Sequence, residues 1–508
     1  MGYFMQTPTD ASQRRTLWLL LAFAAARLLL HVLLNGQYGF HRDELAVLDD
    51  ARHLAWGYIA YPPLTPALGR VELALFGTSL AGFRFFSALA QCAAMVFAGL
   101  IARELGGRRG AQLLAALAVA ATPFSLLTSS LFMYTAFDHL WWVLLAWMTL
   151  RLVNGGNSRW WLGIGLVIGL GMLTRYTMLF CVVGLVAGVL ATPLRRQLGN
   201  RWLWAGVGLS LLVFLPNALW QFRHEFISLD FLQHIHARDM RIGRTDGFLV
   251  QQLYANAGPL LLPLWLVGLW FVAFAQDGAR YRVLAWLYVV PLLLFLLAHG
   301  RGYYLAPAYP MLFAAGAVAC EGWLAGMRPR IATGVRSGVW ALLAVAIVTS
   351  AAIGLPLAPI DSAGWRISRK AHDNFAEQIG WPELVAQVAT IYQSLPPQER
   401  ARTTIYANNY GEAGAIDLYG PAYGLPPAIS NVNSYWYRGY GNPATTTVIV
   451  LGDDAAGMSD TPATCTLAGR VRIPHGIDNE ESGHPDIYLC RKLRMSWDKM
   501  WPETPSFG

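Results

Sequence analysis

Long apolar runs separated by short polar segments fill the first 356 residues of the chain. Nine of these runs are long enough, or nearly so, to cross the hydrocarbon core of a bilayer as a helix. They cover residues 16–35, 81–103, 110–129, 131–152, 203–221, 256–275, 281–298, 303–325 and 336–356. A further run, 160–194, is too long for one span and short for two. The pattern predicts a polytopic α-helical membrane protein.

Arginine clusters in the short polar segments predict how these helices are oriented, because cytoplasmic loops carry an excess of basic residues. The clusters are Arg14 and Arg15; Arg103, Arg108 and Arg109; Arg151 and Arg159; Arg195, Arg196 and Arg201; Arg280 and Arg282; and Arg328, Arg330 and Arg336. If all of them face the cytoplasm, 160–194 must be a hairpin of two short helices that turns near Arg175 and Tyr176. This predicts about eleven spans, with the N-terminus inside and the C-terminus outside.

The composition agrees with a membrane protein, since 55% of the 508 residues are hydrophobic and only 13% are charged. The start of the chain, a polar segment followed by an apolar run, lacks a recognisable small-residue cleavage site, so we expect a retained helix rather than a removed signal peptide. A net charge of +8 could suggest nucleic acid, but the arginines lie in short loops and are a topology signal. No Walker loop, HExxH, CxxC or convincing GxGxxG unit is present.

The chain changes character after Pro356. All three lysines follow it, and short strand-like runs occur at 403–410, 445–452 and 486–493, after a helical pattern at 382–395. We therefore predict two domains: a transmembrane catalytic domain at 1–356 and a soluble extracytoplasmic α/β domain at 357–508.

Cysteine usage is informative only in the second of these domains. Cys92, Cys181 and Cys320 lie in membrane runs, where packing explains them. Cys465 and Cys490 both lie in the predicted outer domain, where a disulfide is permitted, and the sequence leaves their pairing open.

Residues 62–77 predict an amphipathic helix rather than a span, because Leu64, Leu68, Val71 and Leu75 recur at helical spacing. Such a helix could lie in the outer interface and support a lipid-facing groove. It could equally be ordinary packing.

The stretch Phe40–Leu64 sets four acidic residues between apolar segments: Asp43, Glu44, Asp49 and Asp50. Acidic groups are costly near lipid, so they need a physical reason. One interpretation is a solvated loop whose acids cap a short helix. The other is an active site at the membrane surface, with Asp43 or Glu44 as general base.

Four segments resemble one enzyme family, the bacterial family 39 glycosyltransferases, which are related to protein O-mannosyltransferases and the lipid A aminoarabinose transferase. The segments are 40–90 (beginning FHRDELAVLDDARHLAWGYIAYPPL), GLGMLTRYTMLF at 169–180, HGRGYYLAPAYPMLFAAGA at 299–317 and YANNYGEAGAIDLYG at 406–420. The resemblance implies a GT-C fold in the bacterial inner membrane and a polyprenyl-phosphate-linked sugar as donor. The acceptor class stays open among a glycolipid, a cell-envelope polymer and a protein.

The resemblance also implies roles for single residues. Asp43 and Glu44 match the family's Asp-Glu motif, with Asp43 as the base that deprotonates the acceptor and Glu44 positioning it or a loop donor. A single displacement on the sugar would then invert its anomeric centre. Arg175, where relatives often have lysine, and Arg301 are candidates to stabilise the departing phosphate.

Three further residues complete the expected substrate site. Tyr303 and Tyr304 are candidates to contact sugar or phosphate, although aromatic belts at membrane interfaces need no ligand. Asp138 is a candidate second polar wall, against a helix-capping alternative. For Arg175 the alternative is a side chain that snorkels from a helix end.

The sequence does not require a cofactor. His53, His224, His234 and His236 could join the Asp43 carboxylates around a divalent metal ion, but no pair has metal-site spacing, and we predict no metal ligands.

The main alternative function is that of a transporter. A lipid or sugar transporter without transferase activity should place charged or broken-helix residues at mid-membrane in corresponding halves, and no inverted repeat is visible in this sequence. A non-catalytic scaffold, or transfer from a lipid diphosphate, stays open.

Overall fold

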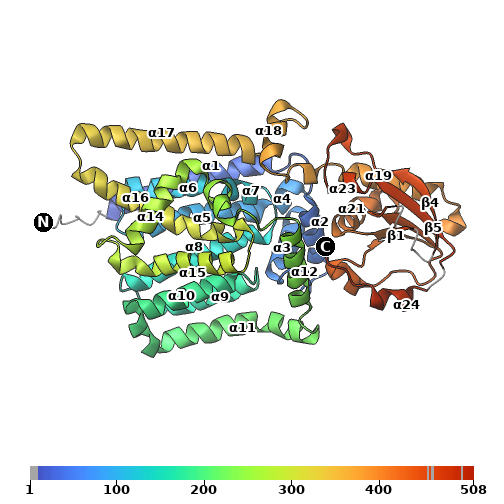
Figure 1. The fold of residues 1–508 in the computed structure, drawn as a ribbon, viewed down its shortest axis with the longest axis horizontal. Coiled ribbons are helices and arrows are strands. Elements are labelled where there is room, and N and C mark those ends of the chain that lie inside the picture. The colour runs from blue at the N-terminus through green and yellow to red at the C-terminus, as the bar shows by residue number, and fades with distance from the viewer. Residues whose placement is uncertain (1–9, 455–456, 459–462, 494–495) are drawn as a thin grey trace. The chain divides into compact units, whose positions relative to one another are not determined.

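The computed structural model describes residues 10–454, 457–458, 463–493 and 496–508 (Figure 1). Residues 1–9, at the start of the predicted retained segment, lie outside it. The chain divides into two compact units. The first, here called the membrane unit, comprises Met1–Asn35, Arg84–Trp220 and Asp239–Leu355. The second, the sheet unit, comprises Gly36–Phe83, Gln221–Arg238 and Pro356–Gly508. The predicted domain boundary at 356 falls next to a boundary between units, and the functional division into two domains stays a prediction.

Every apolar run predicted as a span lies on a helix of the structure. The helices are α1 (Asp10–Leu34), α5 (Phe85–Glu104), α6 (Arg109–Ala120), α7 (Pro123–Ser129), α8 (Tyr134–Val153), α9 (Trp160–Met172), α10 (Met178–Ala191), α11 (Arg201–Arg223), α14 (Leu262–Ala273), α15 (Arg282–Leu297), α16 (Tyr309–Gly326) and α17 (Pro329–Gly354). The run at 160–194 is confirmed as two short helices, α9 and α10, because the chain leaves helical geometry between them, where Arg175 and Tyr176 lie.

Among the described residues, six helices are long and apolar enough to cross a membrane, or up to nine if each bent helix pair counts as one span. One such pair is α6 and α7, which bend by 63° at Ala121 and Thr122, where Thr122 caps α7 and Pro123 begins it. These helices support a multi-pass membrane protein.

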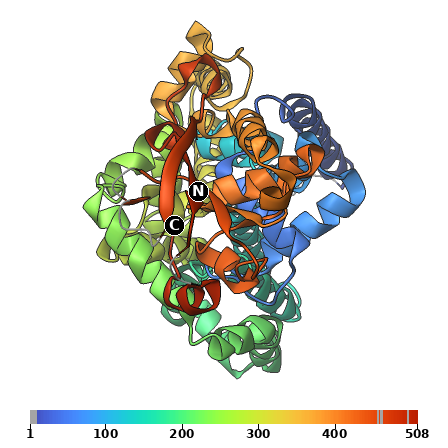
Figure 2. The ribbon, with the colours of Figure 1, turned by 90° about the vertical axis from the view of Figure 1, so that its right-hand side faces the viewer.

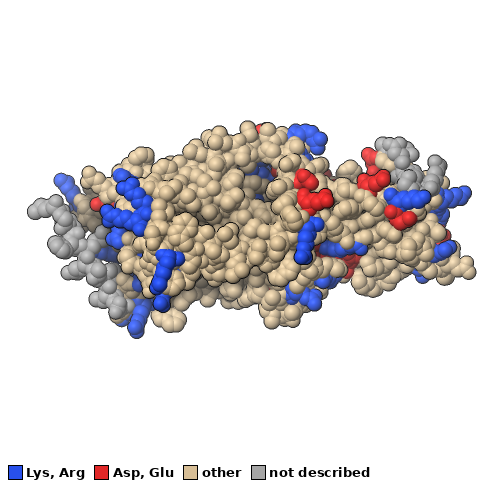
Figure 3. All heavy atoms as spheres, turned by 90° about the horizontal axis from the view of Figure 1, so that it is seen from below, with Lys and Arg blue, Asp and Glu red and all other residues tan. Residues whose placement is uncertain are grey.

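The outer surface of the membrane unit is apolar, as expected for side chains in contact with lipid. Leu211 and Leu212 on α11 are both 64% exposed, and Val348 on α17 is 67% exposed. On the face drawn in Figure 3, which is the side of α11, uncharged atoms form a broad belt, and basic residues gather at one end of the unit. The gathering of basic residues is what the topology prediction requires.

One buried arginine ties α1 to α7 inside the membrane unit. Arg27 is 8% exposed and donates to the carbonyl and hydroxyl oxygens of Ser125, at 3.0 and 2.8 Å, and to the Ser129 hydroxyl at 2.9 Å. A charged group inside a membrane helix is costly unless polar groups surround it. The carbonyl and hydroxyl oxygens of α7 provide that environment.

The C-terminal part of the sheet unit contains a mixed five-stranded sheet in the order β2-β1-β3-β5-β4 (Figures 1 and 2). The strands are β1 (Thr403–Ala407), β2 (Ala428–Ile429), β3 (Thr447–Leu451), β4 (Thr464–Arg470) and β5 (Asp486–Arg491). β1 pairs in parallel with β2 and β3, and β5 runs antiparallel to β3 and β4. Ile405, Ile449 and Ile487 on the three central strands are fully buried, which explains the apolar runs seen in the sequence.

The predicted strands at 403–410, 445–452 and 486–493 contain β1, β3 and β5, and the predicted helix at 382–395 is α19 (Trp381–Ser394). Two elements were not predicted from the sequence. One is β4, whose side chains are mostly exposed. The other is α21 (Tyr410–Tyr419), which overlaps the end of the first predicted strand.

Two segments that lie between apolar runs are helical. Residues 223–246 contain α12 (Ile227–Arg241), a helix that was not predicted from the sequence. The apolar residues Ile227, Phe231 and Ile235 fall at helical spacing there, a pattern obscured by the many polar residues between them. The predicted helix at 62–77 is confirmed as α3 (Leu64–Phe76), with Val71 and Leu75 exposed and Glu72 buried. Exposed apolar residues are compatible with a place at the membrane interface.

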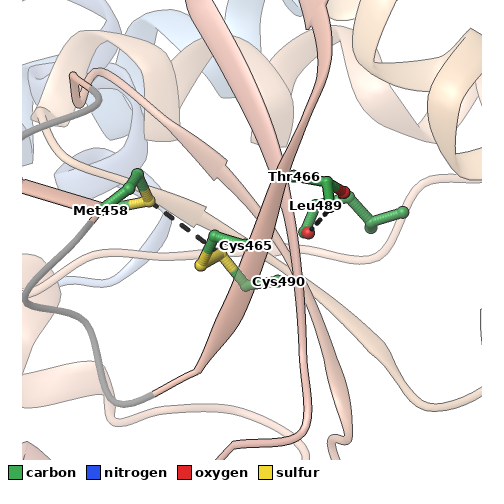
Figure 4. Close-up of a disulfide and its surroundings, with 5 residues drawn as sticks. All are labelled: Met458, Cys465, Thr466, Leu489 and Cys490. Atoms are coloured by element: carbon green, nitrogen blue, oxygen red, sulfur yellow. Dashed lines mark hydrogen bonds between the residues drawn. A yellow bond between two sulfur atoms is a disulfide. The ribbon is translucent and has the colours of Figure 1, made fainter.

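Cys465 and Cys490 form a disulfide between β4 and β5 (Figure 4). They are directly opposite residues of the antiparallel pair, and the Thr466 hydroxyl donates to the Leu489 carbonyl beside them at 3.3 Å. The bond therefore joins the edge strand β4 to its neighbour β5.

We expect reduction of this disulfide to destabilise the sheet unit. The cysteines are 25 residues apart, and closing a loop of that length in the unfolded chain is worth about 3 kcal/mol. The melting temperature of the purified protein should fall in dithiothreitol, and a Cys465→Ser, Cys490→Ser double variant should show the lowered value with and without reductant. An equal melting temperature for wild type in both conditions would contradict this expectation.

Candidate functional site

The first acidic residues of the sheet unit lie on helix α2 (Arg42–Arg52), which begins with a complete capping box. His41 is the N-cap, and its Nδ1 accepts a hydrogen bond from the Asp43 N–H at 3.1 Å. Glu44 Oε2 in turn accepts from the His41 N–H at 2.8 Å, and Glu44 is fully buried. The capping interpretation therefore describes Glu44, and it also fixes the start of the helix that carries Asp43.

Asp49 and Asp50 are held by ion pairs at the other end of α2. Both are buried and contact the guanidinium group of Arg438. Arg438 is the last residue of the 3-10 turn Asn433–Arg438. Asp50 also accepts a hydrogen bond from the Tyr61 hydroxyl at 2.5 Å. A buried carboxylate needs such partners, so a structural role accounts for this pair.

Asp43 differs from the other three acids because its side chain is 33% exposed. Its Oδ1 accepts a hydrogen bond from the Tyr410 hydroxyl at 2.8 Å and lies 3.8 Å from Arg42 Nε. Its Oδ2 lies 3.9 Å from His41 Nδ1. Asp43 thus combines a fixed position with access from solvent, which a general base needs.

The membrane unit brings a second group of predicted residues together around Arg175. The guanidinium carbon of Arg175 lies 4.1 Å from the ring centre of Tyr304, 5.0 Å from that of Tyr134 and 5.3 Å from that of Tyr303. Its Nη1 is 3.8 Å from Asp138 Oδ2. Cation–π contacts on three rings hold this arginine in place.

Arg301 forms a closer ion pair with a carboxylate than Arg175 does. Its Nε and Nη2 donate to the two carboxylate oxygens of Asp239, at 2.6 and 2.8 Å, in a bidentate ion pair. Arg301 also acts electrostatically on Tyr303, Tyr304 and Tyr134. A phosphate would have to compete with Asp239 for Arg301, whereas the carboxylate contact of Arg175 is looser.

The predicted site residues therefore form separate groups. Asp138, Arg175, Tyr303 and Tyr304 meet in the membrane unit, with Arg301 paired to Asp239, whereas Asp43 and Glu44 share α2 in the sheet unit. Sequence reasoning missed Tyr134, Asp239, Tyr410 and Arg438. Of these four, Tyr410 could have been found, because it begins YGEAGAID (410–417), which lies within the segment 406–420 that carries the resemblance.

The described residues contain no group of three or more His, Cys, Asp and Glu side chains placed to hold a metal ion. The histidines and carboxylates considered as possible ligands thus have no arrangement in the described structure that identifies a metal centre.

The YGEAGAID segment also buries an acidic group, Glu412, which is 1% exposed. Burial, followed by the nearby Glu481 carboxyl group, raises the pKa of Glu412 well above its usual range. The folded protein therefore keeps a proton that the unfolded chain releases near pH 4.3.

Because Glu412 keeps its proton in the folded protein, we expect the free energy of unfolding to depend on pH. As pH rises from about 4 towards the raised pKa of Glu412, the free energy of unfolding should fall, by at most about 1.4 kcal/mol per pH unit. Glu412→Gln replaces the protonated acid by a neutral amide, so its melting temperature should decline less between pH 5 and 8. The exposed Glu383→Gln is the control. Equal slopes for wild type and Glu412→Gln would contradict the assignment.

Known proteins resemble this chain in sequence and in fold. Residues 60–220 match the family described as dolichyl-phosphate-mannose-protein mannosyltransferase. Over 290 residues the chain is 27% identical to the lipid A galacturonosyltransferase RgtD of Rhizobium johnstonii. That alignment covers 54% of this chain and 58% of RgtD, so the match spans less than two thirds of this relative.

Solved structures share the fold. ArnT from Cupriavidus metallidurans, bound to undecaprenyl phosphate, superposes with a TM-score of 0.60 at 15% identity, covering 93% of this chain and 97% of ArnT. The arabinofuranosyltransferase AftD from Mycobacteria gives a TM-score of 0.53 at 14% identity over 94% of this chain and 40% of AftD. The sequence matches and the shared fold confirm the predicted resemblance: the chain is a glycosyltransferase family 39-like protein with the GT-C fold.

Proposed function

We propose that this protein is an inverting glycosyltransferase that moves a sugar from a polyprenyl-phosphate donor to an acceptor on the outer face of the bacterial inner membrane. The observation that carries the proposal is Asp43, the one partly exposed acid among the four of Phe40–Leu64, held at the start of a capped helix. The acceptor is a glycolipid, a cell-envelope polymer or a protein.

The relatives support the donor class. The description of the matched family names dolichyl-phosphate-mannose, and ArnT was crystallised with undecaprenyl phosphate. RgtD is a lipid A galacturonosyltransferase, which favours a glycolipid among the three acceptor classes. We also propose about eleven spans, a cytoplasmic N-terminus and an extracytoplasmic C-terminal domain, since the basic clusters follow the positive-inside rule.

The proposed reaction is a single displacement. Asp43 takes the proton of an acceptor hydroxyl group while the acceptor oxygen forms a bond to the anomeric carbon. The bond between that carbon and the phosphate oxygen breaks, and its electron pair leaves on the polyprenyl phosphate. Attack from the face opposite the leaving group inverts the anomeric centre. The leaving group is already a phosphate, so it needs cations rather than a strong general acid, and Arg175 is the proposed first of these.

The proposal is tested with purified protein in lipid and a panel of radiolabelled polyprenyl-phosphate sugars, with candidate acceptors. Release of free polyprenyl phosphate, together with a product of inverted anomeric configuration by NMR, is the expected result. Movement of intact donor across the bilayer without release would support a transporter instead. No release from any donor in the panel would contradict the proposal.

A further inference from the structure

The YGEAGAID segment forms the start of α21, and this helix lies against α2 within the sheet unit. A Cβ atom at Gly414 would come within 2.8 Å of Leu45 Cβ and 2.9 Å of the Leu45 backbone. At Gly411 an added Cβ would overlap the Arg42 side chain. The two glycines are therefore required for the close approach of the helices, which gives this segment a physical role.

Both ends of α2 are tied to α21. At the N-terminal end, the Tyr410 hydroxyl donates to Asp43 Oδ1 at 2.8 Å. At the C-terminal end, Arg52 Nη1 donates to the Asp417 carbonyl at 3.1 Å. Helix α2 is thus held along its length by a segment that lies more than 350 residues later in the chain.

Arg42 fixes the tyrosine in turn. Its guanidinium carbon lies 5.3 Å from the centre of the Tyr410 ring, and its Nη1 forms an ion pair with Glu480 on α23 (Glu480–Gly483). Burial, with the Asp43 carboxylate as a further cause, raises the pKa of Tyr410. The phenol therefore keeps its proton at neutral pH and acts as a hydrogen-bond donor to Asp43.

We infer that Tyr410 is a positioning residue for the Asp43 carboxylate, so that α21 of the C-terminal region is part of the catalytic apparatus. This inference rests on the proposed function, in which Asp43 is the base. Tyr410 keeps its own proton throughout, and the proton of the acceptor goes to Asp43. The hydrogen bond fixes the direction of the carboxylate and stabilises its ionised form.

The charge state of Asp43 depends on all the groups around it. The titratable and charged groups that act on Asp43 include His41, Arg42, Tyr61, Glu377 and Tyr410. Of these, Tyr410 makes the direct hydrogen bond to a side-chain oxygen. Its removal should raise the proton affinity of Asp43, so a higher pH is needed to generate the base.

The test compares Tyr410→Phe with Tyr406→Phe, using release of polyprenyl phosphate from pH 5 to 9. Tyr406 is the matched control because its hydroxyl donates to Asn431 Oδ1 at 2.9 Å, on β1 of the same sheet. For Tyr410→Phe we expect kcat to fall about 10- to 100-fold with KM within about twofold, and the acid limb of the pH profile to move up by about one unit. Tyr406→Phe should keep the wild-type profile.

A second variant covers a failure of Tyr410→Phe to fold. Incorporation of 3-fluorotyrosine at position 410 keeps the ring and the hydroxyl group but makes the phenol a stronger donor. The acid limb should then move to lower pH. A role of Tyr410 in packing alone would leave the limb where it is in wild type, and that result would overturn the inference.

Asp43→Asn, measured in parallel, separates the inference from the function beneath it. Full activity in Asp43→Asn would show that Asp43 is not the base, and it would overturn the positioning role of Tyr410 as well. Loss of activity in Asp43→Asn, with wild-type kcat and pH profile in both Tyr410 variants, would overturn the positioning role alone.

Discussion

Asp43→Asn should abolish sugar transfer while leaving the protein folded. A general base contributes about 100- to 10,000-fold to the rate, so we expect kcat to fall by roughly that factor. The amide has the same shape as the carboxylate, and its oxygen can still accept the Tyr410 hydrogen bond. Donor binding should therefore be retained, and KM for the polyprenyl-phosphate sugar should change little. Release of polyprenyl phosphate, measured at saturating donor, is the readout.

The matched control for this variant is Asp361→Asn, also in the sheet unit. Asp361 is 49% exposed in an ion pair with Arg366 at 3.8 Å, and its left-handed backbone conformation, with φ at +61°, is one that asparagine tolerates. This control should retain wild-type activity, and both variants should melt within a few degrees of wild type, as expected for surface substitutions. Wild-type kcat in Asp43→Asn would show that Asp43 takes no part in the mechanism and that α2 has a structural role only.

Arg175→Gln should have the second largest effect. Removing one preorganised group that stabilises developing charge costs roughly 100- to 1,000-fold in kcat, and we expect a loss of that size if Arg175 stabilises the departing phosphate. Because the charge on the phosphate oxygen grows as the bond breaks, kcat should fall more than donor affinity. Arg175→Lys keeps the charge but loses the planar guanidinium on the tyrosine rings, so it should retain part of the activity.

Arg201→Gln is the control for this pair of variants. Arg201 also packs on an aromatic ring, with its guanidinium carbon 5.3 Å from the Trp202 ring, but it is exposed. It should keep wild-type activity. If Arg175→Gln and Arg201→Gln showed the same kcat, a structural role such as snorkelling would describe Arg175, and the leaving phosphate would need another cation.

The membrane helices were predictable because their signal is local. A run of about 20 apolar residues favours a spanning helix whatever surrounds it, and the predicted runs match α1, α5, α8, α11, α15 and α17 closely. The hairpin at Arg175 was also predictable, because run length and the positions of basic residues both constrained it. By contrast, α12 was missed, since its few apolar residues are separated by polar ones.

At the site, the sequence alone identified the candidate residues: the Asp43 motif, Arg175, Tyr303 and the segment 406–420. It could not rank the four acids of Phe40–Leu64, because burial and pairing are set by partners distant in the chain. Arg438 pairs with Asp49 and Asp50, and Tyr410 donates a hydrogen bond to Asp43. Asp239 likewise becomes visible only as the partner of Arg301. These contacts join residues up to about 390 positions apart, so the accessible acid and the tightly paired arginine are apparent only once the chain is folded.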